Sequence, residues 1–432
     1  MQWTRYLASA ALGAAFGCGR VGFEPWTRPQ SDTSTVACTA DFLVDTAADD
    51  PGQALTCDGA GCSLRAAVAR VNAGAGSTIC IADGLSIAVA TQLVVTRDVT
   101  ITGPSAICGT GSDRVFHVAP GGALRLRDLT VCHGRLTDAQ GAGVLVASGA
   151  TLDVDRVVFD DHAVISDTAE QEGGVIRADG DAVVEIRNAR FTNNHITVSA
   201  AATAFARGGA IAIQAGSAAR VVIEDTAFED NTSTDVGGAM YLAIDAANLT
   251  LARLLFARNS SDTGAAIDIN CASTGTFVID SSTFASNMAP NGVIYVCTAQ
   301  TVRLSFCSAD GNTTSLVQFG AATGRAEWHA NAIHAGAFDL CAGLGTGASL
   351  DYNVADRAGA VCPLGGTNGS HDRLVDPMLG PLADHGGPTA TLALSPGSPA
   401  IDAGGAMCPP IDQRGVARPA GAACDAGAFE AE

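Results

Sequence analysis

The sequence predicts an all-β fold, a solenoid of the right-handed parallel β-helix type, with a short N-terminal capping helix and a loop-rich C-terminal cap. Three features of the 432-residue chain predict it: a recurring Phe-x-x-Asn motif, an alternating apolar strand before each motif, and a small-residue turn after most of them. A unit of this size cannot bury an apolar face alone, so such units are stable only when they stack.

The Phe-x-x-Asn motif recurs at the spacing expected for one coil. Counted from Val131, successive Phe positions lie 28, 32, 37, 28, 28 and 25 residues apart. These intervals hold two or three short strands, whereas a propeller blade needs four. The motif stands at Phe191/Asn194, Phe228/Asn231, Phe256/Asn259 and Phe284/Asn287, and the same frame holds Val131/Gly134, Phe159/His162 and Ala309/Asn312.

A pair of apolar residues stands seven and five residues before each Phe position. Alternation at period two places both members of a pair on one buried face of a strand and leaves polar residues on the other face. The pairs are Leu124/Leu126, Leu152/Val154, Val184/Ile186, Val221/Ile223, Leu249/Leu251, Phe277/Ile279 and Val302/Leu304.

A turn of small residues and a second apolar strand follow most motifs. We expect the Phe side chains to stack inside the coils and the Asn side chains to form a ladder at a bend, where Asn can tolerate left-handed backbone geometry. The turns are Gly173-Gly174-Val175-Ile176, Gly208-Gly209-Ala210-Ile211, Gly237-Gly238-Ala239-Met240, Gly264-Ala265-Ala266-Ile267 and Gly292-Val293-Ile294.

The two ends of the repeat region differ from the coils. Residues 38–98 are expected to form an N-terminal cap, in which Ser63 begins a helix with Leu64, Ala67, Val68 and Val71 on one face. That helix would cover the open edge of the first coil. Coils are expected over residues 99–340, and a Pro- and Gly-rich C-terminal cap over residues 341–432.

The N-terminus predicts export. Arg5 precedes an eleven-residue apolar run at 7–17, which is too short to span a bilayer and is typical of a signal peptide. Cys18 follows at the place of the acylated cysteine of a lipoprotein. We therefore expect a signal peptide at 1–18 with lipidation of Cys18, simple secretion being the alternative, and a flexible linker at 19–37.

Thirteen cysteines follow Cys18, and in an exported protein most are expected to pair. Sequence alone does not fix the connectivity. Nearest neighbours favour Cys57–Cys62, Cys108–Cys132, Cys271–Cys297, Cys341–Cys362 and Cys408–Cys424, and then Cys38–Cys80, which leaves Cys307 free.

The charge of the chain excludes some partners. The formal net charge is −20, and all basic residues are Arg, since the sequence contains no Lys. Nucleic acid and anionic lipid surfaces both require clustered positive charge, so neither is expected to bind. The expected contact with a membrane is through the lipid anchor alone, and the sequence indicates no oligomeric state.

These features resemble a known family. The Cys-Ser-Leu-Arg string at 62–65, the coils and the closing strings resemble bacterial surface proteins of the pectin-lyase-like β-helix superfamily, over roughly residues 38–430. The coils are similar to chlamydial polymorphic outer-membrane protein repeats. The closing strings, from Asp412-Gln413-Arg414-Gly415 to Phe429-Glu430, resemble the choice-of-anchor Q domain. Two departures stand out: Ala66 replaces a usual Glu, and the sorting signal common in the family does not follow, which favours Cys18 as the anchor.

The superfamily also contains polysaccharide lyases and hydrolases, so the resemblance implies that outward carboxylates are candidates for catalysis. Hydrolysis of a glycosidic bond needs a pair of placed carboxyl groups. The candidates are Asp153, Asp155, Asp160, Asp161, His162, Glu185 and Arg187, with Asp153 beside Glu185 and Asp155 beside Arg187 on neighbouring coils. Solvated outward residues of a coil have the same composition, and that interpretation is favoured.

No cofactor is expected, and calcium is the one metal for which residues can be named. An acidic loop at Asp45, Asp49 and Asp50 could hold it. The favoured function is an exported, outer-membrane-tethered, non-catalytic surface protein for adhesion, surface coating or binding of a polysaccharide or cell-surface glycan. The alternative is a polysaccharide lyase or glycoside hydrolase that uses the outward carboxylates of the early coils.

Overall fold

The computed structural model describes residues 40–49, 57, 61–111, 113–167, 170–199, 205–364 and 370–432. They belong to one unit that extends from Thr39 to Glu432. The signal segment with Cys18, the linker, Cys38 and Asp50 lie outside the described residues. No helix in the described ranges has the length and apolar character needed to cross a bilayer.

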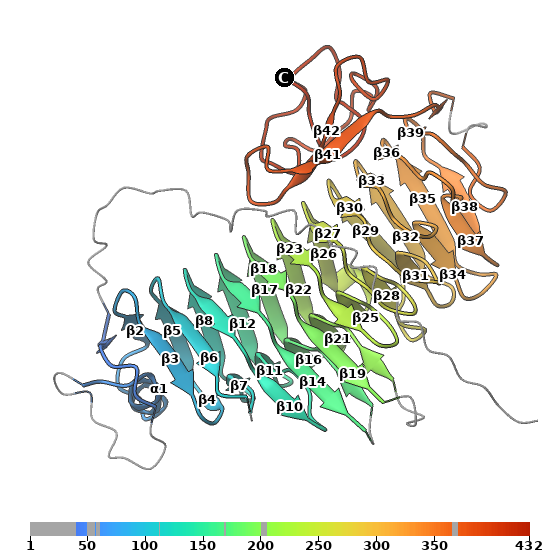
Figure 1. Cartoon of the computed structure of the whole chain (residues 1–432). Helices are drawn as coiled ribbons and strands as arrows, with labels where there is room; N and C mark the ends of the chain where they lie inside the picture. The colour runs from blue at the N-terminus through green and yellow to red at the C-terminus, as the bar shows by residue number, and fades with distance from the viewer. Residues whose placement is uncertain are drawn as a thin grey trace, which may run out of the picture. The chain divides into compact units, whose positions relative to one another are not determined.

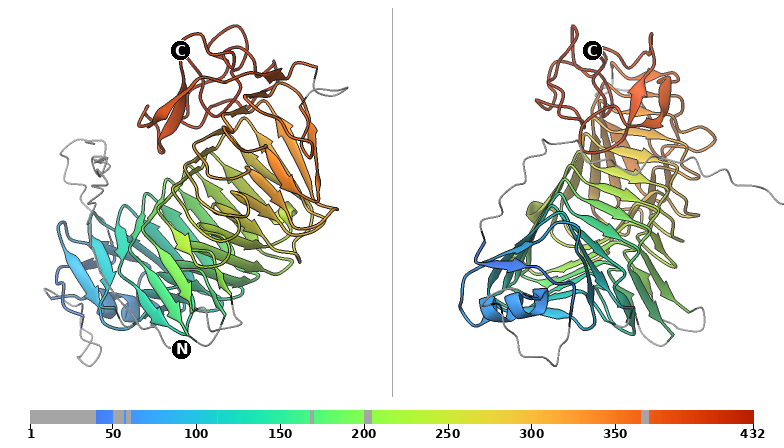
Figure 2. Two further views of the ribbon diagram at one scale, coloured as in Figure 1. Left: turned by 45° about the vertical axis from the view of Figure 1, so that its right-hand side comes forward. Right: turned by 60° about the vertical axis from the view of Figure 1, so that its left-hand side comes forward.

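Each coil contributes one strand to each of three parallel sheets (Figures 1 and 2). In a central coil the chain runs through β12 (Thr151–Asp155) in sheet A, β13 (Val158–Asp160) in sheet B and β16 (Ile176–Gly180) in sheet C. Each strand pairs in parallel with the equivalent strand of the next coil, as in Leu152↔Val184 and Phe159↔Phe191. Equivalent residues of successive coils therefore lie directly above one another.

The strands of the described chain are ordered coil by coil. Sheet A contains β1 (Phe42–Val44), β2 (Thr78–Ile81), β5 (Asp98–Thr102), β8 (Ala123–Arg127), β12, β17 (Val183–Arg187), β22 (Arg220–Glu224), β26 (Leu249–Ala252), β29 (Thr276–Asp280), β32 (Thr301–Ser305), β35 (Arg325–His329) and β38 (Thr346–Ser349). Sheet B contains β3 (Ser86–Val89), β6 (Ala106–Gly109), β9 (Thr130–Cys132), β13, β18 (Arg190–Thr192), β23 (Ala227–Glu229), β27 (Leu255–Ala257), β30 (Thr283–Ala285), β33 (Ser308–Asp310), β36 (Ala332–Ile333), β39 (Val354–Ala355) and β40 (Arg373–Leu374). Sheet C contains β4 (Leu93–Val95), β7 (Phe116–Val118), β11 (Val144–Val146), β16, β21 (Ile211–Ala215), β25 (Met240–Ala243), β28 (Ile267–Ile269), β31 (Ile294–Val296), β34 (Val317–Phe319) and β37 (Cys341–Gly343).

Shorter elements complete the coils. Sheet D lies in the connections between sheets B and C, and a two-stranded sheet E follows it. Sheet D contains β10 (Arg135–Thr137), β14 (Ala163–Ser166), β19 (His195–Val198) and β24 (Thr232–Ser233), and sheet E contains β15 (Gln171–Glu172) and β20 (Ala206–Arg207). A 3₁₀ turn (Ala246–Asn248) precedes β26.

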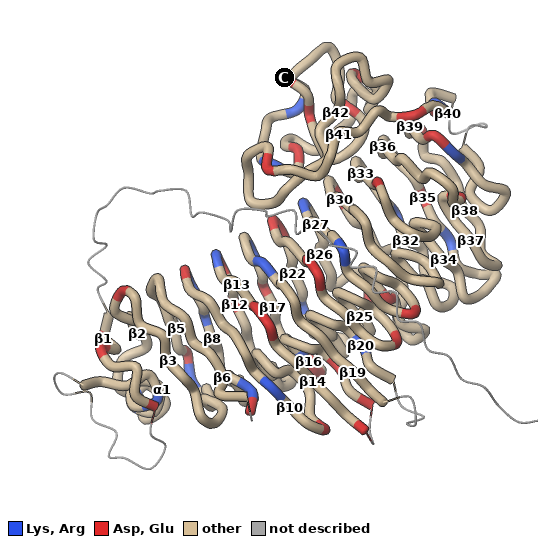
Figure 3. The backbone as a smooth tube through the Cα atoms, in the orientation of Figure 1, with Lys and Arg blue, Asp and Glu red and all other residues tan. Residues whose placement is uncertain are grey.

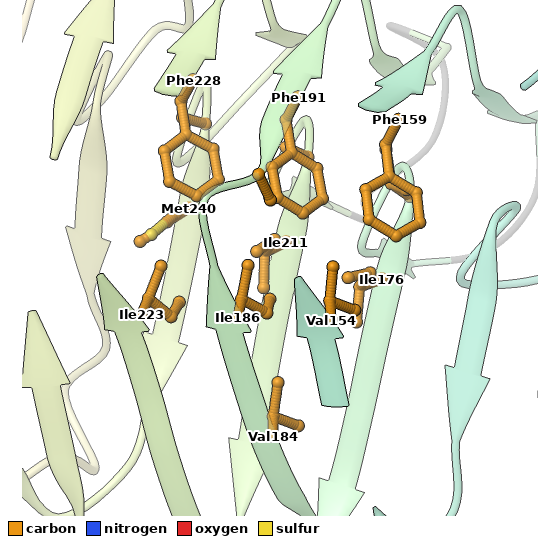
Figure 4. Close-up of a cluster of buried hydrophobic side chains, with 14 of the residues drawn as sticks. Val154, Phe159, Ile176, Val184, Ile186, Phe191, Ile211, Ile223, Phe228 and Met240 are labelled. Carbon is orange, nitrogen blue, oxygen red and sulfur yellow. The ribbon is translucent and has the colours of Figure 1, made fainter. Parts of the chain in front are cut away.

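The interior of the coils contains the residues that the motif predicted. Val154, Ile186 and Ile223 of sheet A face the Phe side chains of sheet B and the apolar residues of sheet C, all buried (Figure 4). The rings stack in parallel, with centroids 4.8 Å apart for Phe159–Phe191 and 4.9 Å for Phe191–Phe228. The stack continues to Phe256 and Phe284 at 5.2 Å per step. The predicted inner ladder is confirmed.

The predicted Asn ladder is also confirmed, and its hydrogen bonds explain it. Asn231 donates from Nδ2 to the Phe191 carbonyl one coil before, at 3.0 Å, and to Oδ1 of Asn259 one coil after, at 3.0 Å. Its own Oδ1 accepts from Nδ2 of Asn194 at 2.8 Å. Buried polar atoms cost free energy unless they are paired, and here each side chain pairs the backbone of the bend. The ladder runs on through Asn287 to Asn312.

One detail of the bend differs from the prediction. The left-handed residue is the one before each Asn: Asn193, Asp230, Arg258 and Ser286 have φ between 55° and 56°. The Asn itself must direct its amide along the coil axis, so the preceding residue makes the sharp turn. Its side chain faces outward, where no specific residue type is required.

A second ladder, which the motif did not predict, forms at the bend between sheets A and B. Asn331 donates to Oδ1 of Asn353 at 2.9 Å, and Asn353 donates to Asp372 at 3.0 Å. Asn331 also accepts from the backbone N–H of Cys307 at 2.9 Å. The second ladder therefore begins where the first ends, and it holds the last coils at the bend between sheets A and B.

The predicted N-terminal helix is present as α1 (Leu64–Asn72), and Ser63 caps it by accepting from the Ala66 N–H at 3.2 Å. Leu64, Ala67, Val68 and Val71 are buried against the first coil, as predicted. Arg65 joins the helix to the loop before it, with Nε 2.6 Å from Asp49. The parallel sheets nevertheless begin at β1, so strands occupy part of the segment expected to be a cap.

The C-terminal region does not cap the end of the coils as expected. Parallel strands continue to β40, past the expected boundary at 340. Val361, Cys362 and Leu364 pack against the core at the last coils. The segment after β40 instead lies along the outer face of sheet B (Figure 1), where its antiparallel pair β41 (Leu379–Ala383) and β42 (Thr391–Leu394) covers small side chains. Those side chains are Ala227, Leu255, Ala257, Ala285, Ala332 and Val354.

Buried charges hold this lateral segment together, and they account for the closing strings of the sequence. Arg418 lies 3.6 Å from Glu430 and donates to the Asp425 carbonyl at 2.9 Å. Asp412 pairs with Arg414 at 2.8 Å. Gln413 reaches back to the coils and accepts from Thr283 Oγ1 at 2.6 Å. Each of these charged side chains is buried and has a partner of opposite charge or a hydrogen-bond partner. A buried charge needs such a partner, because removal from water is otherwise too costly.

The described cysteines pair as their spacing suggested. The structure contains the disulfides Cys57–Cys62, Cys108–Cys132, Cys271–Cys297, Cys341–Cys362 and Cys408–Cys424. Cys80 is disulfide-bonded, and Cys307 is free and buried. Cys108–Cys132 and Cys271–Cys297 join neighbouring coils.

Candidate functional site

The outer face of sheet C has the most unusual polar row in the described chain. The central residue of each strand points outward between two buried apolar residues, and the register stacks Arg177, Ala212, Tyr241, Asp268 and Tyr295 in that order. Arg177, Tyr241 and Asp268 are buried although they lie on the outer face. The loops that carry β15 and β20 supply two of the side chains that surround them.

The first part of this row is a network of charges that neutralise one another. Arg177 pairs with Glu172 of β15 and lies 2.6 Å from Asp179. Arg207 of β20 lies 2.8 Å from Glu172 and also pairs with Glu170. Its guanidinium carbon stands 5.2 Å from the Tyr241 ring centroid. Each of the three acids at this end of the row, Glu170, Glu172 and Asp179, therefore pairs with at least one of the two arginines.

Asp268 is different, because its carboxyl group has no hydrogen-bond partner among the described residues. It is 5% exposed. Burial raises the pKa of Asp268 to about 7, and the nearby Arg207 opposes the rise only in part. Ala212 and Gln318 occupy equivalent positions of the row, so the fold does not require an acid there. Its carboxyl oxygens are not among the fully enclosed polar atoms that lack a partner, so they keep a small contact with solvent. A carboxyl group that has lost most of its hydration and gained no cation or donor within the protein costs stability, which indicates a role other than packing.

Tyrosines flank this carboxyl group on both sides in the ladder. Tyr241 is buried and accepts a hydrogen bond from Asn270, whereas Tyr295 is partly exposed. Burial raises the pKa of both phenols, so both stay protonated at neutral pH. Rings with a polar tip offer an apolar face and a hydrogen-bonding group to a ligand. We call Tyr241, Asp268 and Tyr295 the sheet C site.

A second feature is an open groove of about 530 Å³ in the connections from sheet B to sheet C. Hydroxyl groups and one exposed apolar side chain, Met288, line it. No buried unpartnered group faces it, so it is the weaker candidate. Its lining includes Ser233, Thr234, Ser260, Ser261, Asp262 and Thr313.

Part of the chain matches a known family model. Residues 115–318 match the family model described as the right handed beta helix region. The fold is a right-handed parallel β-helix. Neither curated proteins nor solved structures give a match. The match includes the coils that carry the sheet C site.

The carboxylates proposed from the sequence do not converge in this β-helix. Asp153 and Asp155 pair in register with Glu185 and Arg187 on sheet A, as expected. Asp160 lies on sheet B and Asp161 at the following bend, so the group is divided between two faces. The bend after each sheet A strand turns the chain, and residues five positions apart then face different directions.

Each of these carboxylates is also paired. Asp153 contacts Arg127, and Glu185 lies 2.8 Å from Arg187. Asp155 pairs with Arg156. The charges over sheet A thus lie beside opposite charges of neighbouring coils (Figure 3). Asp160 accepts from Thr192 at 2.7 Å, and Asp161 lies 2.7 Å from Arg135.

His162 belongs to the Asn ladder. Its Nδ1 accepts from the Gly134 N–H at 3.1 Å, and its Nε2 lies 3.1 Å from the Val131 carbonyl. Asn194, one coil further on, makes the same two contacts: its Oδ1 accepts from the His162 N–H, and its Nδ2 donates to the Phe159 carbonyl. The neutral Nε2–H tautomer therefore fits this position. Burial lowers the pKa of His162 to about 4, and the ring is neutral at pH 7.

The calcium candidates bind protein groups. Asp45 accepts from the Gly61 N–H at 2.9 Å, and Asp49 pairs with Arg65 and accepts from the Ala90 N–H at 2.7 Å. Within the described ranges, one set of side chains has the spacing of a metal site: Cys108, Cys132 and His133. Both of its sulfur atoms form a disulfide.

Sequence reasoning missed the sheet C site because only the apolar residues of these strands were used. A signal was present. An apolar residue stands on each side of Tyr241, Asp268 and Tyr295, so each is the outward member of a buried strand. Asp268 therefore lies between two tyrosines at the equivalent outward positions of the neighbouring coils. The outward acids of sheet A differ, because they lie beside arginines.

The ladder role of His162 predicts a pH effect on stability. The pKa in the folded state is about 4, below the value of 6.5 for an exposed imidazole, so protonation favours the unfolded chain as the pH falls from 6.5 to 4. His162→Asn keeps both hydrogen bonds without a titrating group. Between pH 7 and pH 4.5, urea unfolding should show the wild type losing about 2 kcal/mol more stability than the variant. Equal losses would contradict the buried, neutral imidazole.

Proposed function

We propose that this protein is an exported, non-catalytic β-helix protein that binds glycan at the sheet C site. The observation that carries the proposal is the unpartnered carboxyl group of Asp268 between two tyrosines. A sugar hydroxyl supplies the missing donor, and an aromatic ring packs against the apolar face of a sugar. Successive coils repeat at about 4.8 Å, so a row of equivalent positions suits an extended chain.

The surrounding charges support binding rather than hydrolysis. A glycosidase needs two carboxyl groups, one of them free to act on water or on the sugar. Glu172, the nearby acid on β15, is occupied by Arg177 and Arg207. The raised pKa of Asp268 suits a general acid, and this favours a glycoside hydrolase as the second candidate.

Binding to a panel of soluble polysaccharides, followed by calorimetry, tests the proposal. Asp268→Asn and Tyr295→Ala should each weaken binding about tenfold or more, which corresponds to roughly 1.4 kcal/mol. Met288→Ala, in the hydroxyl-lined groove, is the matched control and should leave the affinity unchanged. Loss of binding in Met288→Ala alone would move the site to the groove. Release of reducing or unsaturated ends that Asp268→Asn abolishes would establish the enzyme instead.

We further propose that the protein is tethered to the outer membrane through Cys18. The apolar run before Cys18 and the disulfides support an extracytoplasmic location, since disulfides persist in oxidising compartments. Labelling cells with a fatty-acid probe should mark the wild type and not Cys18→Ala. Label that survives in Cys18→Ala, or an unlabelled wild type, would show that the protein is not anchored at this residue.

A further inference from the structure

Asp268 differs in one respect from the other buried acids of the described chain. Glu172 and Glu229 each pair with two arginines, Asp412 pairs with Arg414, and Glu430 lies near Arg418. Asp425 accepts from two backbone N–H groups. Each of these acids has a cation or a donor within the protein, and Asp268 has neither in contact.

Arg207, the cation whose charge acts on Asp268, does not pair with its carboxyl group directly. Arg207 acts on Asp268 only through its charge, because its guanidinium is engaged by Glu170 and Glu172. It does lie over the ring of Tyr241, at 5.2 Å. The outer face of sheet C therefore already holds one cation against a tyrosine beside acidic groups.

The surroundings of Asp268 suit a second cation. Tyr241 precedes it and Tyr295 follows it in the ladder, so the carboxyl group stands between two phenol rings. The faces of such rings attract cations, and the attraction strengthens when water is excluded. Asp268 is 5% exposed, so the part of it that solvent reaches is small and suits contact with a small group such as an ammonium.

The charge of the whole protein favours the same ligand. The sequence has 44 acidic and 24 basic residues, a formal net charge of −20. A field of this sign concentrates cationic ligands near the surface and repels anionic ones, with a strength that falls as salt is added.

We propose that Asp268 receives an ammonium group, and that the glycan bound at the sheet C site carries free amino sugars. This inference rests on the proposed glycan binding and names its ligand class. An ammonium ion that binds beside Asp268 stabilises the ionised carboxylate, so binding displaces the proton that the isolated group holds at slightly acidic pH.

Calorimetry at pH 6 and low salt, with two ligands of equal length, tests the inference. One ligand is an oligomer of glucosamine and the other is its fully N-acetylated form. The wild type should prefer the free amine about tenfold or more, and Asp268→Asn should lose that preference. Asp262→Asn removes an exposed acid from the groove and so controls for the change in net charge. This variant should keep the preference for the free amine.

Proton release gives a second readout. Titrations in two buffers of different ionisation enthalpy should show that the wild type releases more protons than Asp268→Asn on binding the glucosamine oligomer. Equal release by the two proteins would overturn the inference.

The outcomes separate this inference from the glycan proposal. If the acetylated oligomer or another neutral glycan binds at the sheet C site as tightly as the glucosamine oligomer, the proposal of glycan binding is kept and the proposal of an ammonium ligand is wrong. If spermidine displaces the glucosamine oligomer at equal amine concentration, the ligand is a free polyamine and the proposal of an amino sugar is wrong. If no glycan binds, both proposals fall.

Discussion

The coils depend on one constraint: each of their strands pairs in register with the equivalent strand one coil away, so a side chain stacks on the residues at the same position of the neighbouring coils. Phenylalanine satisfies this by parallel stacking at 4.8 to 5.2 Å. Asparagine satisfies it because one amide both donates and accepts, so a buried column of Asn pairs with itself and with the bend backbone. Outward acids that lie directly opposite one another, such as Asp153 and Glu185, would destabilise the sheet unless each also paired with an arginine. The outward charges therefore pair with opposite charges, within a strand or between coils. Arg127 beside Asp153 and Arg187 beside Glu224 follow that rule.

Asp268 stands out against this pattern. Its neighbours in register are Tyr241 and Tyr295. Neither phenol carries a charge that could neutralise the carboxylate, and neither donates a hydrogen bond to it. The cost of burial appears as a pKa of about 7. Ala212 occupies the equivalent position one strand before Tyr241, so a small neutral side chain suffices for the fold there. An acid that costs stability at such a position is best explained by binding of a ligand. The proposed glycan site and its ammonium group both follow from this single departure.

The sequence predicted the coils well because their pattern is local and periodic. The Phe and Asn positions, the inward pairs of sheet A, the face of α1 and the pairings of the described cysteines were all readable from spacing. The placement of the C-terminal segment was not, because it depends on contacts between residues more than a hundred positions apart, such as Gln413 with Thr283. The left-handed residue was placed one position too late, since Asn tolerates that geometry in general but is needed here for its amide. The outward position of Tyr241, Asp268 and Tyr295 was readable from the apolar residues on each side of them. Their burial was not, because it depends on side chains from the loops that carry β15 and β20.

The protonation state of Asp268 tests the central claim most directly. Infrared difference spectra of the wild type minus Asp268→Asn, recorded from pH 5 to pH 9, isolate the carboxyl band of this one residue. The account predicts a protonated carboxyl band at pH 5 that gives way to carboxylate with a midpoint near pH 7, in agreement with its burial without a partner. A carboxyl group that is already ionised at pH 5 would show that Asp268 has a partner within the protein, and would contradict the account.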